Sequence, residues 1–242
     1  MKIALMGAMV EEVDPFLGEG EHEPLLEYFE VTNSVEYGGN VFHEASYKGV
    51  DIVLAYSRIG KVYASLTATT MIERFGCDTL LFTGVAGAVS EDLKIGDLVA
   101  AIQLCQHDLD ITAFGHPHGY VPEGKVYIEP SRKLLGIAAE VARERGIALK
   151  KGIIATGDQF IADPEKKEWI AKTFEADAIE MEGAAVAAVC DALDVPFFVL
   201  RAISDAADMD AAFDFDEFLK HSSKVSSGFI TAMLDKLAMA RE

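Results

Sequence analysis

The sequence predicts an α/β protein in which one mainly parallel sheet is covered on both faces by helices. Short apolar runs, typical of buried strands, alternate along the 242 residues with segments of helical periodicity. Half of the residues are hydrophobic, which is enough for a sizeable core. No internal repeat, linker or low-complexity segment interrupts this alternation, although the length alone allows one large domain or two small ones.

The N-terminal half opens with a strand followed by a helix. Lys2 to Met6 is an apolar strand candidate that ends at Gly7, and Ala8 to Val13 begins a helix with acids in its first turn. The same order occurs in dinucleotide-binding folds, but that motif needs three glycines at set spacing and this segment has only Gly7. A polar loop is expected from Gly18 to Pro24.

The rest of this half alternates strands with one helix. A helix is predicted from Gly60 to about Phe75, because small and apolar residues recur on one face. A tight loop of small residues is expected from Gly84 to Val89. The predicted strands are Val41 to Tyr47, Asp51 to Ser57, Thr79 to Thr83 and Asp97 to Gln103, the first two joined by a hairpin at Lys48-Gly49.

The C-terminal half begins with Cys105 to Gly124, a segment without periodicity whose length is typical of functional or mobile loops. One helix start is well marked, because Asp163 is an N-cap residue followed by Pro164 at the first helical position. The predicted strands here are Gly152 to Thr156 and Phe197 to Ile203. The predicted helices are Ser131 to Arg145, Asp163 to about Phe174, Ala184 to Leu193, and a final long helix that begins at Asp214 to Asp216 and runs through Leu237.

The charge balance narrows the class of partner. With 40 acidic and 21 basic residues the net charge is −19, which argues against binding nucleic acid or an anionic membrane. The three cysteines are scattered among apolar residues, so we expect buried thiols in a reducing compartment. No apolar run approaches the roughly 20 residues that span a bilayer. The start of the chain is too short for a signal peptide. We therefore expect a cytoplasmic protein.

The stretch from Ala178 to Asp205 organises the candidate site. Glu180 and Glu182 precede an Ala-rich helix, and Asp205 ends an apolar strand that only Arg201 interrupts. Because charges are costly in a core, carboxylates at the ends of buried elements indicate a site at the carboxyl edge of the sheet. The alternative is purely structural: Glu182 is a favourable acid at a helix N-terminus, and Asp205 caps the next element.

Four loops after predicted strands carry further candidates, and in an α/β sheet such loops gather at one edge. They are Gly7 to Glu12, Gly84 to Ala88, Gly157 to Ile161, and Ser204-Asp205. The glycines of the second loop either let the backbone approach a ligand closely or form a plain tight turn. Phe160 is either an aromatic platform for a ligand or a core residue.

Other kinds of chemistry lack their sequence signatures. His116 and His118 have no third ligand at a recognisable spacing, so we expect solvated loop histidines and no metal. No nucleophilic Ser or Cys motif and no phosphate-binding loop spacing is found. The remaining possibility is carboxylate chemistry, with Glu12, Glu182 and Asp205 as the participants.

At these residues the chain resembles the 5′-methylthioadenosine/S-adenosylhomocysteine nucleosidases of the purine and uridine nucleoside phosphorylase superfamily. The resemblance covers essentially the whole chain. Within the family, the chain is most similar to the epsilonproteobacterial branch, whose members also resemble enzymes that hydrolyse 6-amino-6-deoxyfutalosine in menaquinone synthesis. It rests on Gly7-Ala8-Met9 with Glu11-Glu12, Ile59-Gly60-Lys61-Val62, Thr83-Gly84-Val85-Ala86-Gly87, Thr112-Ala113-Phe114-Gly115, Gly157-Asp158-Gln159-Phe160-Ile161, Glu180-Met181-Glu182-Gly183, Arg201-Ala202-Ile203-Ser204-Asp205 and Phe215-Asp216-Glu217-Phe218.

The resemblance implies a single nucleoside phosphorylase-like domain over residues 1–242, with a central mixed, mostly parallel sheet flanked by helices. It implies hydrolysis of adenine nucleosides to adenine and the free sugar, without a metal or organic cofactor. Asp205 would be the general acid that protonates the purine, and Glu12 the general base that activates water at the anomeric carbon. Such groups each contribute about 10² to 10⁴ in rate. Glu182 would accept hydrogen bonds from the ribose hydroxyls.

The remaining implied roles concern substrate binding. By this resemblance Phe160 stacks on adenine, the backbone of Ile161 reads its edge, and Ala86 and Gly87 pass close to the base. Met181 lines the ribose, and Arg201 and Ser204 position the water and the acid. The apolar slot for the 5′-alkylthio group is formed by Met9, Ile59 and Phe215. Phe114, His116 and Pro122 match a segment that reaches the neighbouring subunit's site. The resemblance thereby implies a homodimer.

Two other functions compete with hydrolysis. A phosphate-dependent purine nucleoside phosphorylase must hold a dianion, usually with Arg and with hydroxyl or amide donors. Here Met9 and Glu12 stand where a phosphate-binding Arg would be needed, and Val85 offers no hydroxyl. A non-catalytic nucleoside-binding protein on the same fold is expected to lack Glu12 or Asp205, and both are present. The residues therefore favour the hydrolase.

Overall fold

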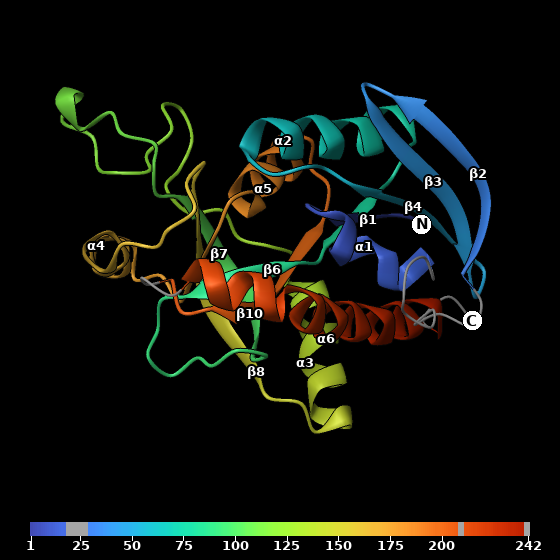
Figure 1. Cartoon of the computed structure of the whole chain (residues 1–242). Helices are drawn as coiled ribbons and strands as arrows, with labels where there is room; N and C mark the ends of the chain where they lie inside the picture. Colours follow the sequence, from blue (N-terminus) through green and yellow to red (C-terminus); the bar gives the residue numbers. More distant parts are fainter. Residues whose placement is uncertain (18–28, 208–210, 240–242) are drawn as a thin grey trace.

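The computed structural model describes residues 1–17, 29–207 and 211–239. Its strands are β1 (Lys2–Gly7), β2 (Glu30–Tyr37), β3 (Asn40–Tyr47), β4 (Val50–Tyr56), β5 (Thr79–Phe82), β6 (Val85–Ala88), β7 (Leu98–Gln106), β8 (Leu149–Thr156), β9 (Ala178–Glu180) and β10 (Phe197–Asp205). Its α-helices are α1 (Val10–Leu17), α2 (Lys61–Thr69), α3 (Arg132–Arg145), α4 (Pro164–Phe174), α5 (Gly183–Ala192) and α6 (Ala211–Met239). Figure 1 shows their arrangement.

All the described strands join one mixed sheet in the order β2-β3-β4-β1-β5-β10-β6-β9-β8-β7. Six of the ten pairings between them are parallel and four are antiparallel. β10 has three partners: its first residues pair with β5, its last with β6, and Leu200 to Ala202 also pair with β7. The strands from β10 through β6, β9, β8 and β7 therefore form a closed ring.

Two apolar layers cover the sheet, because successive residues of a strand point to opposite faces. On β1, Ala4 and Met6 face the layer that contains α2 and α5, whereas Ile3 and Leu5 face the layer that contains α1, α3 and α6. Figure 1 shows α2 and α5 above the sheet and α3 and α6 below it. The expectation of a sheet covered on both faces is confirmed.

Several predicted elements are found with their expected ends. α4 begins at Pro164, and the carboxylate of Asp163 accepts hydrogen bonds from the backbone N–H groups of Glu165 and Lys166. α3 begins after Ser131, whose hydroxyl accepts from the N–H of Leu134. The predicted hairpin at Lys48-Gly49 joins β3 to β4. In each case a capping or turn residue marks the boundary in the sequence itself.

Two predictions were wrong, and a third, the helix from Lys61 to about Phe75, is confirmed as helical but with a change in the type of helix. Gly84 to Val89 is not a tight loop, because Val85–Ala88 form strand β6, which pairs with both β10 and β9. The helix from Lys61 does not remain α-helical to Phe75, since Thr70–Arg74 form a π-helical turn, η1. The segment from Cys105 is not irregular from its start, because β7 continues to Gln106 and a short 3-10 helix, η2, spans Thr112–Phe114.

Besides β6, two strands were not predicted. β2 is a mostly exposed edge strand without alternating apolar residues, and β9 has only three residues. The polar loop expected at Gly18 to Pro24 lies outside the described residues. Among the helices of the described ranges, none combines the length and the apolar character that a bilayer crossing requires.

Candidate active site

The described residues line a cavity of about 370 Å³ at one end of the closed ring of strands. All four loops singled out in the sequence contribute to its wall. These loops were expected to meet because parallel strands end at one edge of a sheet. That explanation is incomplete, because β8 and β9 run antiparallel to β6 and β10. The loop after β8 reaches the site because the end of β8 pairs with the end of β9, and β9 pairs antiparallel with β6 beside Asp205.

Most of the predicted site residues lie on this wall. They are Met9, Ile59, Ala86, Gly87, Phe160, Ile161, Met181, Glu182, Ser204, Asp205 and Phe215. The lining residues that the sequence analysis gave no role are Ala8, Val85, Gln159, Ile179, Glu180, Ala207, Ala212 and Asp216. Each of these is a close neighbour in the chain of a predicted residue, so the motifs themselves located the wall. Glu12 and Arg201 lie just behind it.

Glu12 is buried beneath the loop that follows β1. One of its carboxylate oxygens accepts from the backbone N–H groups of Ala8 (2.6 Å) and Met9 (3.1 Å), and the other accepts from the N–H of Val85 (3.0 Å). Burial raises the pKa of Glu12 above its ordinary value, although Arg201 and these three N–H groups favour the ionised form. A buried carboxyl with a raised pKa suits proton exchange with a bound water.

Asp205 ends β10 with its carboxylate against the backbone of Gly87. One oxygen accepts from the N–H of Ala207 (2.9 Å) and the other from the hydroxyl of Ser204 (2.9 Å). A Cβ atom on Gly87 would lie 2.7 Å from the Asp205 oxygen, so only glycine permits this approach. Asp205 does fix the backbone that follows β10, as the structural alternative required, but its carboxylate also faces the cavity.

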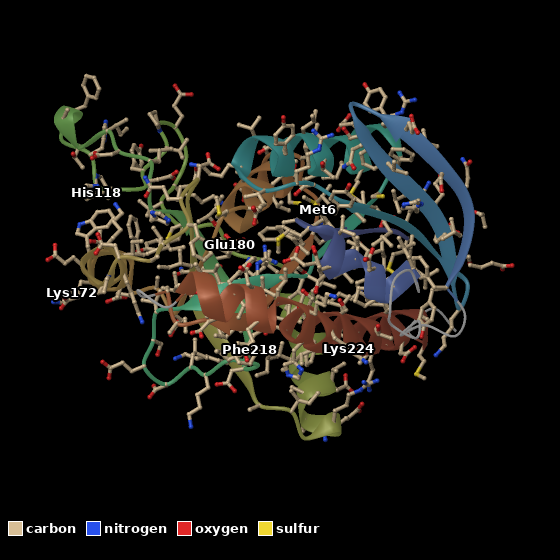
Figure 2. The ribbon with its side chains drawn as sticks, in the orientation of Figure 1. Met6, His118, Lys172, Glu180, Phe218 and Lys224 are labelled. Carbon is tan, nitrogen blue, oxygen red and sulfur yellow. The ribbon has the colours of Figure 1, made fainter. Side chains whose placement is uncertain are left out.

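A buried ion pair supports the wall between these two carboxylates. The Arg201 guanidinium donates to Glu180 at 2.6 Å, and both side chains are almost fully buried. The Glu180 oxygens also accept from the N–H groups of Glu182 and Gly183 and from the hydroxyl of Thr156. Figure 2 labels Glu180 near the middle of the molecule. Glu180, rather than Glu182, therefore accepts from the first backbone N–H of α5, the helix start at which the structural alternative made Glu182 a favourable acid.

Glu182 is left to face the cavity. One oxygen accepts from the backbone N–H of Gly60 at 2.8 Å. Burial and the charge of Glu180 raise the pKa of Glu182 to about 8, although Gly60 and Arg201 oppose this rise. Arg201, the one Lys or Arg side chain buried among the described residues, pairs with Glu180 and lies near enough to influence the charges of Glu12 and Glu182. Asp205 is a further buried acid on the cavity wall. Such a site favours a ligand that donates hydrogen bonds or carries positive charge.

Part of the cavity wall is apolar and exposed to solvent. Phe160 and Ile59 are each about half exposed there, at 48% and 53%. The Phe160 ring meets the ring of Phe215 edge to face, with centroids 5.6 Å apart. An aromatic side chain that lines a cavity without being packed in the core offers its face to a planar ligand. Of the two readings of Phe160, its position favours the platform.

The residues expected to serve a second subunit lie apart from this cavity. Phe114 is 81% exposed, and the ring of His116 stacks on Tyr120. Pro122 lines a separate hollow between the segment after β7 and α5. His118, on the same outlying segment in Figure 2, packs against Trp169. None of the three predicted residues contributes to the described wall of this chain's own cavity.

No part of the described structure groups three or more His, Cys, Asp or Glu side chains in a way that could hold a metal ion. Cys77, Cys105 and Cys190 are free and buried, as expected. Burial raises the pKa of each thiol to about 12, so none is a thiolate nucleophile near neutral pH.

Comparisons with known proteins agree in family and fold. A family model described as "Phosphorylase superfamily" matches residues 2–235. The chain is 54% identical over 237 residues to an aminodeoxyfutalosine nucleosidase of Campylobacter jejuni, covering 98% of this chain and all of that protein. It is 38% identical over 240 residues to a 5′-methylthioadenosine/S-adenosylhomocysteine nucleosidase of Actinobacillus succinogenes, with 98% and 100% covered. The native structure of the futalosine hydrolase of Helicobacter pylori superposes with a TM-score of 0.93 at 48% identity, covering 98% of both chains.

Proposed function

We infer that this chain, which belongs to the phosphorylase superfamily, cleaves adenine nucleosides with water. It is an N-glycosyl hydrolase: its relatives are named as nucleosidases over the whole length that they share with it. The substrates are 5′-methylthioadenosine, S-adenosylhomocysteine and related adenine nucleosides, including 6-amino-6-deoxyfutalosine. The products are adenine and the free sugar.

The observation that favours water over phosphate is the position of the Glu12 carboxylate. The backbone N–H groups of Ala8, Met9 and Val85 converge as they would on a bound anion, and Glu12 already occupies them. A phosphate dianion would have to displace this buried carboxylate or lie beside it, and like charges at close range repel strongly in a medium of low dielectric constant. Water meets no such repulsion.

The proposed mechanism assigns one carboxyl to each side of the glycosidic bond. Asp205 protonates the purine as the bond breaks, with the Ser204 hydroxyl holding the carboxyl in place. Glu12 accepts a proton from the attacking water, and Arg201 lies near enough to influence its charge. Glu182 accepts hydrogen bonds from the ribose hydroxyls and stabilises the positive charge that develops on the sugar.

The binding roles follow the shape of the cavity. We propose that Phe160 stacks on adenine, with Ile161, Ala86 and Gly87 around the base. Met181 lies at the ribose. Met9, Ile59 and Phe215 form the apolar slot for the 5′ substituent, supported by their common position on the cavity wall.

We also propose a homodimer in which Phe114, His116 and Pro122 complete the partner's site. The exposed position of Phe114 supports this arrangement, because 81% of its surface is left uncovered in the described part of the chain. α2 adds a second exposed apolar surface, formed by Val62, Tyr63 and Leu66. Such surfaces mark contact sites in proteins. Residues 1–242 are proposed to form one domain, and the free buried thiols support a cytoplasmic location.

Product analysis tests the reaction. The purified protein is incubated with 5′-methylthioadenosine, with and without inorganic phosphate, and the products are separated by chromatography. Adenine and free methylthioribose, in amounts unaffected by phosphate, are expected. A sugar phosphate formed only when phosphate is present would identify a phosphorylase and contradict the argument from Glu12. 6-Amino-6-deoxyfutalosine is the next substrate in the same assay.

A further inference from the structure

Three segments that are distant in sequence meet beside Glu182. The Asp158 carboxylate, in the loop after β8, accepts from the first backbone N–H of α2, that of Lys61, at 2.8 Å. The N–H of the preceding residue, Gly60, donates to Glu182. Gly60 has φ +99°, and a Cβ atom on it would lie 3.1 Å from the Asp158 oxygen. The turn that contacts Glu182 is therefore fitted against Asp158.

Asp158 is in turn anchored from β7. Its backbone N–H donates to the carboxylate of Asp108 at 2.9 Å, and the Lys61 ammonium donates to the other Asp108 oxygen at 2.7 Å. Burial of Asp108 raises its pKa, but these bonds outweigh burial and hold the pKa below its ordinary value. Lys61, Asp108 and Asp158, which we call the Asp158 bridge, are therefore joined by three hydrogen bonds that involve both backbone and side-chain groups.

The backbone of the same loop packs closely against the His107 ring at Gly157. A Cβ atom on Gly157 would lie 2.4 Å from two ring atoms of His107, which is buried. Phe160 and Ile161 follow directly and line the cavity. One short segment thus has its backbone fixed by His107 and Asp108, its Asp158 carboxylate bonded to α2, and its Phe160 ring exposed to the ligand.

We propose that Asp158 is a positioning residue for hydrolysis: it links the segment that stacks on the base to the turn that orients Glu182 toward the ribose. This inference rests on the proposed function, because it assumes that Phe160 and Glu182 contact the two halves of a nucleoside. Asp158 itself contacts neither half. Its carboxylate acts through Lys61 and Gly60 on one side and through its own backbone on the other.

The test compares two Asp158 variants with a matched control. Asp158→Ala removes the acceptor, whereas Asp158→Asn keeps a carbonyl oxygen for the Lys61 N–H. Asp163→Ala is the control, because Asp163 is an exposed aspartate of the same connection that also accepts backbone N–H bonds at a helix start. The kinetic constants for 5′-methylthioadenosine and the inhibition constant of adenine alone are measured, and thermal unfolding verifies folding.

Asp158→Ala is expected to lower kcat/KM about tenfold and to weaken adenine inhibition several-fold, the loss that one charge-assisted hydrogen bond produces. Asp158→Asn and Asp163→Ala are expected to remain within about threefold of wild type. Lys61→Met, which removes the Asp108 partner but keeps the backbone donor, should weaken adenine inhibition in the same direction.

Each other result is decisive. Suppose that the wild type releases adenine. The positioning role is then overturned if Asp158→Ala has the same kinetic constants as Asp163→Ala, or if Asp158→Ala and Asp158→Asn lose the same amount of activity. If Asp158→Ala does not fold, unchanged adenine inhibition in Lys61→Met overturns the role instead. A wild-type protein that releases no adenine would refute the proposed function, and this inference with it.

Discussion

Asp205 and Glu12 hold their carboxylates in different ways. Asp205 accepts one hydroxyl and one backbone N–H, whereas Glu12 accepts three backbone N–H groups and lies deeper, behind the wall. Both are buried, and Asp205 lies on the cavity wall. In the proposed mechanism, this difference in environment accompanies the opposite roles of the two groups as acid and base.

The first prediction concerns these two carboxyls. Asp205→Asn and Glu12→Gln should each lower kcat by about 10² to 10⁴, because each removes one proton-transfer group. Substrate binding should be largely retained, since the replacements keep the size and one oxygen acceptor. Single-turnover kinetics and calorimetric binding measure both quantities. Asp191→Asn, a change of the same chemistry at a surface ion pair with Lys125, is the control. Full activity in either variant would remove that residue from the mechanism.

The second prediction concerns the effect of Glu182 on the free energy of unfolding of the protein without ligand. Its folded-state pKa of about 8 exceeds the ordinary value of 4.5. The folded protein therefore binds the proton more tightly than the unfolded chain, and the group's contribution to stability is lost as the pH rises from 4.5 through 8. Glu182→Gln should raise the free energy of unfolding by about 2 to 4 kcal/mol at pH 8 and by much less at pH 5.

Denaturant titrations at the two pH values measure this difference. Glu168→Gln, on the exposed face of α4, is the control and should show no such pH dependence. Equal effects of Glu182→Gln at pH 5 and pH 8 would show that burial does not hold a proton on Glu182. The same variant should bind nucleosides poorly, because a glutamine amide offers the ribose hydroxyls one oxygen acceptor where a carboxylate offers two.

Among the elements, the connection after β8 has the tightest fit. Gly157→Ala should destabilise the protein by about 1 to 3 kcal/mol and reduce nucleoside binding, because its methyl group overlaps the His107 ring and displaces the segment that carries Phe160. Adding His107→Ala should recover part of the loss. Gly136→Ala is the control: it lies in α3 with open space around it, and it should be neutral or slightly stabilising.

Thermal unfolding and adenine inhibition of the single and double variants measure the coupling. Strictly additive effects of Gly157→Ala and His107→Ala would show that the two positions do not share the space. The His107 ring nitrogens have no hydrogen-bond partner among the described residues. Its replacement therefore removes packing rather than a polar contact that the described structure contains.

The sequence predicts elements well where local chemistry marks them. Asp163-Pro164 and Ser131 located two helix starts, and continuous apolar runs located β1, β5 and β10. It fails where the element is defined only by distant partners. Val85–Ala88 contain two alanines and one glycine, which have low strand propensity, and they become a strand because β10 and β9 lie on either side.

The residues of the candidate site likewise fall into those that local motifs predict and those that only distant contacts define. Short motifs indicated the residues on the wall, because each motif follows a strand. The Asp158 bridge had no such signal, since its members are separated by 47 and 50 positions in the chain. Glu180 was recognised as an acid in a buried stretch, but its pairing with Arg201 and its capping of α5 depend on the register of β9 and β10 around β6.

At the scale of the whole molecule, the proposed homodimer makes activity depend on assembly. Val62 on α2 is 75% exposed beside Leu66, and a charge there should oppose burial of this apolar surface. Val62→Asp is expected to sediment as a monomer and to lose most of its activity at low concentration, because Phe114 no longer reaches a second site. Val31→Asp, on the exposed edge strand β2, should leave both unchanged. A fully active Val62→Asp monomer would contradict the arrangement.

The position of β10 determines when this protein can fold during its synthesis. β10 is the last described strand to leave the ribosome, yet it lies sixth in the order of ten and joins both parts of the sheet. A nascent chain that ends before about residue 197 has no strand between β5 and β6, and it leaves both strand edges exposed. The edges of β5 and β6 that face β10 therefore stay unpaired until β10 has been synthesised. Premature termination upstream of Asp205 would yield an aggregation-prone fragment, not a weakened enzyme.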